Sequence, residues 1–219
     1  GRNSSNYRTP FRCTKGWGNV MEPFTQFTAV AAPLNQDNLD TDQILPARYL
    51  MMPRDKRYGT YVFRDLRIDQ EGKEIEEFVL NQKSFREARI IVAAKNFGCG
   101  SSREGAVFTL VDGGFRSIIA ASFGDIFYNN SFNNGLLPVT LPEDQVSTLR
   151  EQLNNKPGTK IGVSLETQHV IFPDKSKVSF EIDPHRRHRL LNGLDAVDYT
   201  LQFEEKISSF EKNHQDISL

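Results

Sequence analysis

The stretch KNFGCGSSREG, residues 95–105, gathers the residue types in this sequence that are best suited to chemistry. Two glycines precede Ser101 and Ser102, and Arg103 and Glu104 follow directly. The stretch leaves an apolar run and enters a segment with apolar residues at helical spacing, which predicts a turn between a strand and a helix. Such a turn can simply cap the helix, or it can bind a ligand.

The structural interpretation of this turn is a capping box. The Ser101 hydroxyl can accept a hydrogen bond from the Glu104 amide, and the Glu104 side chain can reach back to the Ser101 amide. Gly98 and Gly100 would then only supply the backbone freedom that a tight turn needs. A Ser-x-x-Glu pattern ahead of a helix is a cap far more often than a catalytic site.

Three nucleotide-binding or hydrolase motifs do not fit the turn. A P-loop needs a lysine where Ala106 stands, and a dinucleotide fingerprint needs a third glycine at position 103, which is arginine. A nucleophile elbow needs Gly-x-Ser-x-Gly, and neither serine has a glycine two residues on. A serine hydrolase is therefore the weakest alternative, although His169, His185 and Asp183 lie downstream.

A carboxylate site is the interpretation that gives every residue of the turn a purpose. A helix N-terminus offers free amides and about half a positive charge. Arg103 adds a planar fork of donors that matches a carboxylate. The serine hydroxyls can hydrogen-bond the same ligand, and one could accept a proton if the helix dipole and Arg103 stabilised its alkoxide.

The segments around this turn predict an α/β fold. Four apolar runs predict strands: 24–34, 88–95, 116–122 and 136–141. Three segments with helical spacing or a proline-led N-terminus predict helices: 103–115, 123–135 and 142–155. Because strands and helices alternate, we expect a parallel core sheet with helical crossovers.

Other segments depart from this alternation. Residues 159–182 predict a smaller antiparallel part, and apolar residues on one face at 199–210 predict a C-terminal helical segment. Residues 51–75 are charged and punctuated by proline and glycine, so we expect an exposed, mobile excursion. Residues 1–20 lack acidic residues and are expected to be a disordered leader, either added by cloning or lying upstream of a true start at Met21. A transit-like extension is the third alternative, and 21–219 is expected to be one domain.

Composition and charge exclude several functional classes. The formal net charge of −1 over 219 residues gives no electrostatic basis for binding nucleic acid or an anionic membrane. No apolar stretch approaches the roughly 18 residues that a membrane span requires. Two cysteines, Cys13 and Cys99, fit a reducing compartment, so we expect a cytoplasmic protein. Two thiols also cannot hold an iron–sulfur cluster alone, because such clusters usually need about four protein ligands.

Four stretches taken together resemble the small subunits of 3-isopropylmalate dehydratase, which belong to the aconitase superfamily. The stretches are APLNQDNLDTDQILPARYL, NFGCGSSREG, GFRSIIAASFGDIFYNNSFNNGLLPV and LLNGLDAVDYTLQ, and the likeness runs from about Met21 to about Glu211. The resemblance implies a swivelling β/β/α sandwich like the aconitase C-terminal domain. It also implies a hydro-lyase of leucine biosynthesis that interconverts 2-isopropylmalate and 3-isopropylmalate through 2-isopropylmaleate.

The same resemblance implies that the activity needs a second chain. The family's large subunit holds a [4Fe–4S] cluster through cysteines and forms a heterodimer with the small subunit, which binds no cofactor or metal itself. One alternative is a related subunit acting on citraconate or homoaconitate. Another is a non-catalytic binding subunit, supported only by Gly105, where the family usually has histidine.

The resemblance also implies roles for individual residues. Ser101 would be the general base that removes and returns the carbon-bound proton, while Ser102 and Arg103 would hold a substrate carboxylate. Asp42 would orient the site, with a turn-forming role as an equal alternative. The segment after Asp42 would sort substrates, and Arg54 stands where aconitase has an arginine for its extra carboxylate. One of three residues is expected to face the isopropyl group: Tyr49, Leu50 or Met51.

Overall fold

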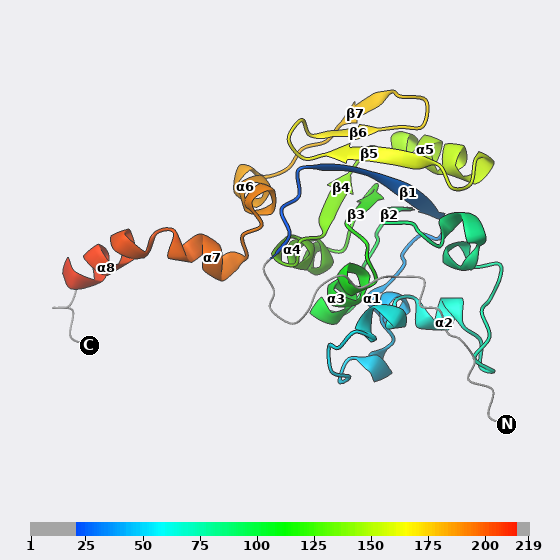
Figure 1. Ribbon diagram of the computed structural model, residues 1–219, viewed down its shortest axis with the longest axis horizontal. Coiled ribbons are helices and arrows are strands. Elements are labelled where there is room, and N and C mark those ends of the chain that lie inside the picture. The colour runs from blue at the N-terminus through cyan, green and yellow to red at the C-terminus, as the bar shows by residue number, and fades with distance from the viewer. Residues whose placement is uncertain (1–20, 214–219) are drawn as a thin grey trace.

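A computed structural model describes residues 21–213, which contain a seven-stranded mixed sheet (Figure 1). Four strands run parallel: β1 (Gln26–Leu34), β2 (Ile90–Ala93), β3 (Ser117–Ala120) and β4 (Leu137–Thr140). Three strands continue the sheet antiparallel from the other edge of β1: β5 (Lys160–Ser164), β6 (His169–Ile171) and β7 (Lys177–Ser179). The order is β4-β3-β2-β1-β5-β6-β7. This confirms the α/β fold with a parallel core and a smaller antiparallel part. The predicted leader, residues 1–20, lies outside the described residues.

The parallel strands are continuous apolar runs because both faces of their sheet are buried. Along β2, Ile90 and Val92 belong to one hydrophobic core, whereas Ile91 and Ala93 belong to the other. Successive side chains of a strand point to opposite faces, so the two cores lie on the two sides of the sheet. A single strand thereby anchors both layers of the protein.

Helices connect the parallel strands, as the alternation of the sequence predicted. The crossover helices are α3 (Glu104–Asp112) after β2, α4 (Asp125–Asn133) after β3 and α5 (Glu143–Asn155) after β4. Helix α5 packs on one side of the sheet and α3 on the other (Figure 1). Each of the three begins one or two residues after its predicted start, and α3 ends directly before Gly113.

The segment between β1 and β2 is a packed layer over the α3 side of the sheet, not an exposed excursion. It holds two short α-helices and four 3-10 helices: α1 (Thr41–Ile44), α2 (Arg64–Arg67), η1 (Ala47–Tyr49), η2 (Tyr58–Tyr61), η3 (Val79–Asn81) and η4 (Lys83–Phe85). Val62 and Phe63 are fully buried, and Tyr58 is 3% exposed. The prediction of exposure holds for residues 51–53 and 69–71, but it was wrong for 58–63, where a few buried anchors stand among charged residues without periodicity.

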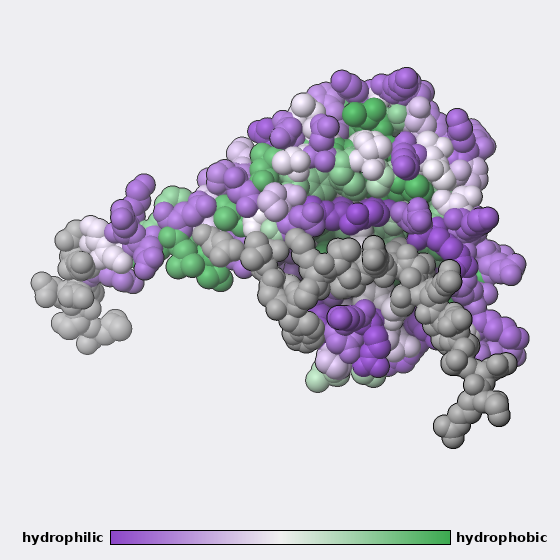
Figure 2. All heavy atoms as spheres, in the orientation of Figure 1, coloured by the Kyte–Doolittle hydropathy of each residue, from purple (hydrophilic) through white to green (hydrophobic). Residues whose placement is uncertain are grey.

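The predicted C-terminal helical segment is confirmed, but it is broken into pieces. Helix α6 (Pro184–Asn192) packs on the body through buried Leu190. Helices α7 (Ala196–Leu201) and α8 (Glu204–Asn213) then form an arm that projects away from the sheet (Figure 1). Apolar residues lie on the surface of this arm (Figure 2), and the side chains of Val197 and Phe210 are 65% and 62% exposed. Among the helices that the structure describes, none has the length and apolar character to cross a membrane.

Candidate functional site

The two predicted parts of the site meet at one edge of the parallel sheet. Strands β1 and β2 are neighbours, with Leu34 paired to Ala93 at their carboxyl ends. The loops that follow them therefore emerge at the same edge, which is where open α/β sheets bind ligands. The first loop leads into α1 and the second into α3. A parallel bridge between Asp40 and Cys99 extends the pairing into the loops.

Hydrogen bonds fasten the two loops to each other. The Gly98 amide donates to the Leu39 carbonyl at 2.7 Å, and the Thr41 amide donates to the Cys99 carbonyl at 2.9 Å. The Thr41 hydroxyl donates to the Ser101 carbonyl at 3.0 Å, and Thr41 is only 2% exposed. The first turn of α1 thus holds the backbone of the predicted base.

Glycines shape this turn as the sequence predicted. Gly98 and Gly100 have φ values of +71° and +91°, which favour glycine. A Cβ on Gly98 would lie 2.3 Å from the ring of Phe127 in α4, whereas a Cβ on Gly100 would make ordinary contact with Asp40 at 3.6 Å. Position 98 therefore requires glycine for two reasons: its positive φ and the close approach of α4.

The capping box predicted at Ser101 is wrong. Helix α3 begins at Glu104 with Arg103 as its N-cap, and no side chain among the described residues caps it. The Glu104 carboxylate accepts instead from the side-chain amide of Asn134, at the end of α4, at 2.9 Å. Ser101 and Ser102 are exposed. Both serines are consequently accessible to an anionic ligand, and no side chain that the structure describes occupies the N-terminus of α3 as a cap.

A capping box is present instead at α1, and sequence reasoning missed it. The Asp40 carboxylate accepts from the Gln43 amide at 2.8 Å, and the Gln43 side chain accepts from the Asp40 amide at 3.0 Å. The pattern Asp-x-x-Gln ahead of buried Ile44 was the signal for it. Since Asp40 performs the capping, Asp42 keeps its carboxylate for another partner.

That partner is Arg103, which forms an ion pair with Asp42 across the two loops. Its Nη1 donates to Asp42 Oδ1, although the two residues are 61 positions apart in sequence. The Arg103 side chain is 18% exposed and that of Asp42 is 51% exposed. A guanidinium carries five N–H donors, so this contact leaves donors for a second carboxylate.

Leu50 is the residue of the predicted substrate-sorting trio that the structure places beside α3. A Cβ on Gly105 would lie 3.3 Å from Leu50 Cδ2. Gly105 follows Arg103 by two positions in the first turn of α3. An apolar side chain from the loop after α1 therefore lies against the first turn of α3.

The other two residues of the trio lie elsewhere. The Tyr49 ring stacks on Tyr61 with centroids 4.3 Å apart, and the Arg48 guanidinium lies 4.6 Å from its centroid. Met51 is 94% exposed. Among the contacts that the structure describes, neither residue contacts the serine turn.

Arg54 is engaged by Asp112, the last residue of α3. Its Nε and Nη2 donate to the two carboxylate oxygens of Asp112 at 2.7 and 2.9 Å, and its guanidinium lies 4.1 Å from the Phe108 ring centroid. The hydrogen bonds to Asp112 raise the pKa of Arg54. Asp112 is the last residue of nine-residue α3, roughly 12 Å from its first turn. Both oxygens of the Asp112 carboxylate therefore already occupy the Arg54 guanidinium.

The downstream residues of a hydrolase triad do not assemble on the serine turn. The Asp183 carboxylate caps α6 by accepting from the amides of His185 and Arg186. The His185 ring meets the Tyr199 hydroxyl at 3.2 Å in the C-terminal arm. The His169 ring instead contacts the backbone carbonyl of Thr167. The structure thus removes the support that these residues lent to a serine hydrolase.

The described residues do not fit an iron–sulfur cluster. Within 21–213, no group of three or more His, Cys, Asp or Glu residues could hold a metal ion. Such a cluster usually takes about four protein ligands. Burial, with a smaller contribution from nearby Asp40, raises the pKa of the Cys99 thiol, which disfavours the thiolate form that metals bind.

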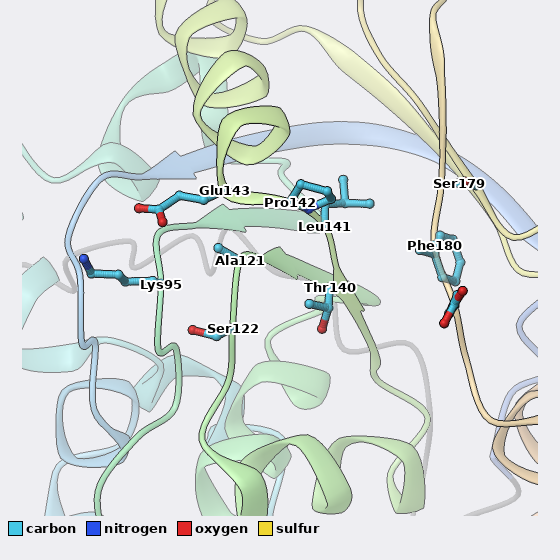
Figure 3. A pocket seen from close by; sticks show the side chains of 10 residues that line it. Lys95, Ala121, Ser122, Thr140, Leu141, Pro142, Glu143, Ser179 and Phe180 are labelled. Atoms are coloured by element: carbon cyan, nitrogen blue, oxygen red, sulfur yellow. The ribbon is translucent and has the colours of Figure 1, made fainter.

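A groove separate from the serine turn lies along the same edge of the sheet, beyond β3 and β4 (Figure 3). Its lining includes Lys95, Ser122 and Glu143, and none of the residues predicted for the site. Lys95 pairs with Asp37 at 3.5 Å, and the Ser122 hydroxyl accepts from the backbone amide of residue 96 at 2.8 Å. Two of its polar side chains, Lys95 and Ser122, therefore already contact the loops that follow β1 and β2.

Known proteins share both the sequence and the fold. Residues 21–144 match the model of the aconitase C-terminal domain family. The 3-isopropylmalate dehydratase small subunit of Paramagnetospirillum magneticum is 47% identical over 198 residues, covering 90% of this chain and 98% of that protein. The corresponding subunit of Granulibacter bethesdensis is 50% identical over 194 residues, covering 88% and 92%. A crystal structure of 3-isopropylmalate dehydratase from Methanocaldococcus jannaschii is similar with a TM-score of 0.60 and 28% identity, covering 85% of this chain and 99% of that one.

Proposed function

Because this chain belongs to the family of 3-isopropylmalate dehydratase small subunits, we propose that it supplies the base and the carboxylate clamp for interconverting 2-isopropylmalate and 3-isopropylmalate. The reaction removes water to give 2-isopropylmaleate and then adds water back so that the hydroxyl and the hydrogen have exchanged carbons. It is a step of leucine biosynthesis. The observation that carries this proposal is the Arg103–Asp42 pair beside two exposed serines and an uncapped helix N-terminus.

Arg103 and the start of α3 form the carboxylate clamp. The guanidinium presents paired donors that match the two oxygens of a carboxylate, and the open amides of α3 add partial positive charge. Arg103 is mostly shielded from solvent, so its attraction for an anion is less screened than that of a surface arginine. Asp42 holds the guanidinium from the α1 side, and Ser102 adds a hydroxyl donor.

Ser101 acts as the general base in this proposal. In the dehydration direction its oxygen takes the proton from the carbon beside the bound carboxylate, and it later returns that proton to the neighbouring carbon. An alkoxide is strongly disfavoured in water, so it needs local positive charge. Arg103 and the dipole of α3 supply that charge, and the bond from Thr41 holds the Ser101 backbone in place.

In this proposal the substrate carries an apolar substituent, the isopropyl group, in addition to its two carboxylates. Leu50 offers apolar surface beside Gly105 in the first turn of α3, and Arg54 is held by Asp112 rather than left open for a third carboxylate. Both observations favour isopropylmalate over homoaconitate. Citraconate carries a methyl group in place of isopropyl and is the second candidate. An apolar pocket distinguishes two substrates by only about 1–3 kcal/mol for each methylene by which they differ.

The large subunit completes the proposed enzyme. It would hold the [4Fe–4S] cluster, which supplies a Lewis acid for the substrate hydroxyl when bound. The donor set of residues 21–213 does not fit that cluster, so the division of labour assigns proton transfer and carboxylate binding to this chain. We place the heterodimer in the cytoplasm, where iron–sulfur clusters and free thiols are compatible with the reducing environment.

Hydration of 2-isopropylmaleate tests the proposal. Purified chain, purified cluster-loaded large subunit and their mixture are each assayed with 2-isopropylmaleate and with citraconate. We expect turnover of 2-isopropylmaleate by the mixture alone. Turnover by this chain alone would refute the division of labour, and a mixture that converts only citraconate would refute the assigned substrate. A mixture that assembles but converts neither acid would leave the chain as a binding subunit.

A further inference from the structure

Glu104 places a negative charge at the start of α3, where the proposed clamp binds a substrate carboxylate. It follows Arg103 directly and is the first residue of the helix. Carboxylates are stabilised at helix N-termini, because the free amides and the helix dipole attract negative charge. The Glu104 carboxylate and a substrate carboxylate are therefore competitors for the same end of α3, and two negative charges held close together also repel each other.

The two adjacent charged side chains are held by different elements. Arg103 pairs with Asp42 of α1, whereas the Glu104 carboxylate accepts from Asn134 Nδ2, at the end of α4, at 2.9 Å. The same Nδ2 donates to the Asn130 carbonyl at 2.9 Å, so both hydrogens of the Asn134 amide are used. The amide therefore joins the open carbonyl end of α4 to the first turn of α3.

The end of α4 gives Asn134 a firm support. Its backbone amide donates to the Ser131 carbonyl at 3.1 Å, and that carbonyl also accepts from the Leu136 amide at 3.0 Å. Ser131 and Leu136 are both fully buried. The Ser131 hydroxyl donates in turn to the Phe127 carbonyl at 2.8 Å. The backbone on both sides of Asn134 is therefore anchored in the body of the protein, whereas Glu104 is exposed and depends on Asn134 for its orientation.

We propose that Asn134 is a positioning residue for substrate binding: it holds the Glu104 carboxylate at the end of α4 and keeps it off the carboxylate clamp. This inference rests on the proposed function. Without the Asn134 amide, the Glu104 side chain turns toward Arg103 and the start of α3, and its charge opposes a bound carboxylate. The cost falls on substrate binding, because Ser101 and its bond from Thr41 are unchanged.

The test measures hydration of 2-isopropylmaleate by the complex with the large subunit. Asn134→Ala should raise KM by about 10-fold, the size expected of one contact between like charges at a partly shielded site, with kcat within about 2-fold of wild type. Asn129→Ala is the matched control, because Asn129 lies on the same helix and accepts from Arg186 of α6 at 2.7 Å. Its KM should stay within about 2-fold of wild type. Equal KM values for the two variants would overturn the inference.

A neutral residue at position 104 separates this role from a general loosening of α4. In a Glu104→Gln complex the competing charge is gone, so adding Asn134→Ala should change KM by less than about 2-fold. A rise in KM that persists in this background would mean that Asn134 acts by supporting α4, and the inference would be wrong.

Glu104→Asp covers failure of Asn134→Ala to assemble. It keeps the charge and suits a first helical turn, but its carboxylate is one methylene short of Asn134. We expect KM to rise at least about 3-fold, whereas Glu104→Gln should leave KM no higher than in wild type. The same KM for both variants would contradict the inference. A wild-type complex that does not convert 2-isopropylmaleate would instead refute the proposed function, so the two failures are distinguishable.

Discussion

At the scale of single residues, the shape of Arg103 matters as much as its charge. A guanidinium can hold Asp42 and a substrate carboxylate together, whereas a lysine ammonium offers three donors from one point. Hydrogen bonds between charged groups contribute about 1.5–3 kcal/mol. We therefore expect Arg103→Lys to raise KM for 2-isopropylmaleate roughly 10- to 100-fold in the assembled enzyme, measured by steady-state kinetics.

Arg57→Lys is the matched control for this substitution. Arg57 pairs with Asp55 at the surface, and its side chain is 73% exposed. Exposed ion pairs contribute little, so KM should stay within about 2-fold of wild type. Equal kinetics for the two variants would mean that Arg103 does not bind the substrate.

The residues of the serine turn could be predicted from sequence because their chemistry lies within three adjacent positions, Ser101 to Arg103. The role of Thr41 in the site could not be predicted. Its hydroxyl reaches the Ser101 carbonyl only because β1 and β2 are neighbours in the sheet. The capping role given to Ser101 was wrong for a related reason. The Glu104 side chain accepts a hydrogen bond from Asn134 at the end of α4, which is not its neighbour in sequence.

At the scale of elements, the turn after β2 depends on Gly98 fitting under α4. Gly98→Ala must adopt a left-handed conformation and place a Cβ 2.3 Å from the Phe127 ring. The conformational and steric costs together should lower the free energy of unfolding by roughly 2–5 kcal/mol. Chemical denaturation of the purified chain, followed by circular dichroism, measures this loss.

Gly72→Ala isolates the conformational part of that cost. Gly72 has a φ of +84°, and a Cβ on it would meet nothing within 4 Å. We expect a loss of only about 1–2 kcal/mol there. If Gly98→Ala proved no more costly than Gly72→Ala, the close approach of α4 would not be what shapes the turn.

Elements with one dominant pattern could be predicted, whereas the layer between β1 and β2 could not. Strand β2 is four consecutive buried apolar residues, a pattern that survives without knowledge of its neighbours. The layer is instead held by single anchors such as Phe63 and by polar contacts such as Arg67 Nε donating to Asn81 at 3.2 Å. Such contacts have no period along the chain, so the segment looked like an exposed loop.

At the scale of the whole molecule, the C-terminal arm contributes little to the fold. Its apolar residues Leu201 and Phe210 are 56% and 62% exposed, so they bury little area against the body. A chain ending at Leu194 should therefore unfold with a free energy within about 1 kcal/mol of the full chain, measured by chemical denaturation.

A chain ending at Ile182 provides the contrast, because it also loses α6. Leu190 is fully buried there, and its carbonyl accepts from the Phe24 amide at 2.9 Å. Loss of a buried leucine alone costs about 2–5 kcal/mol. Equal stabilities for the two truncated chains would contradict the assignment of α6 to the body and of α7–α8 to the arm.

The joining of the parallel and antiparallel parts is a property of the whole molecule that local patterns do not carry. The sequence predicted both parts, but it did not indicate that β5 pairs with β1 and merges them into one sheet. On its other side β1 pairs in parallel with β2, which puts the carboxyl ends of both strands at the same edge, where the serine turn meets Asp42. The site therefore depends on strand order as well as on its own residues.

The kcat of the assembled enzyme carrying Ser101→Ala tests the central claim most directly. Removing a general base should lower kcat for hydration of 2-isopropylmaleate by about 10²–10⁴-fold, while KM and assembly with the large subunit stay near wild type, because Arg103 still holds the carboxylate. A kcat within about 3-fold of wild type would contradict the account, since the proton would then be moved by another group.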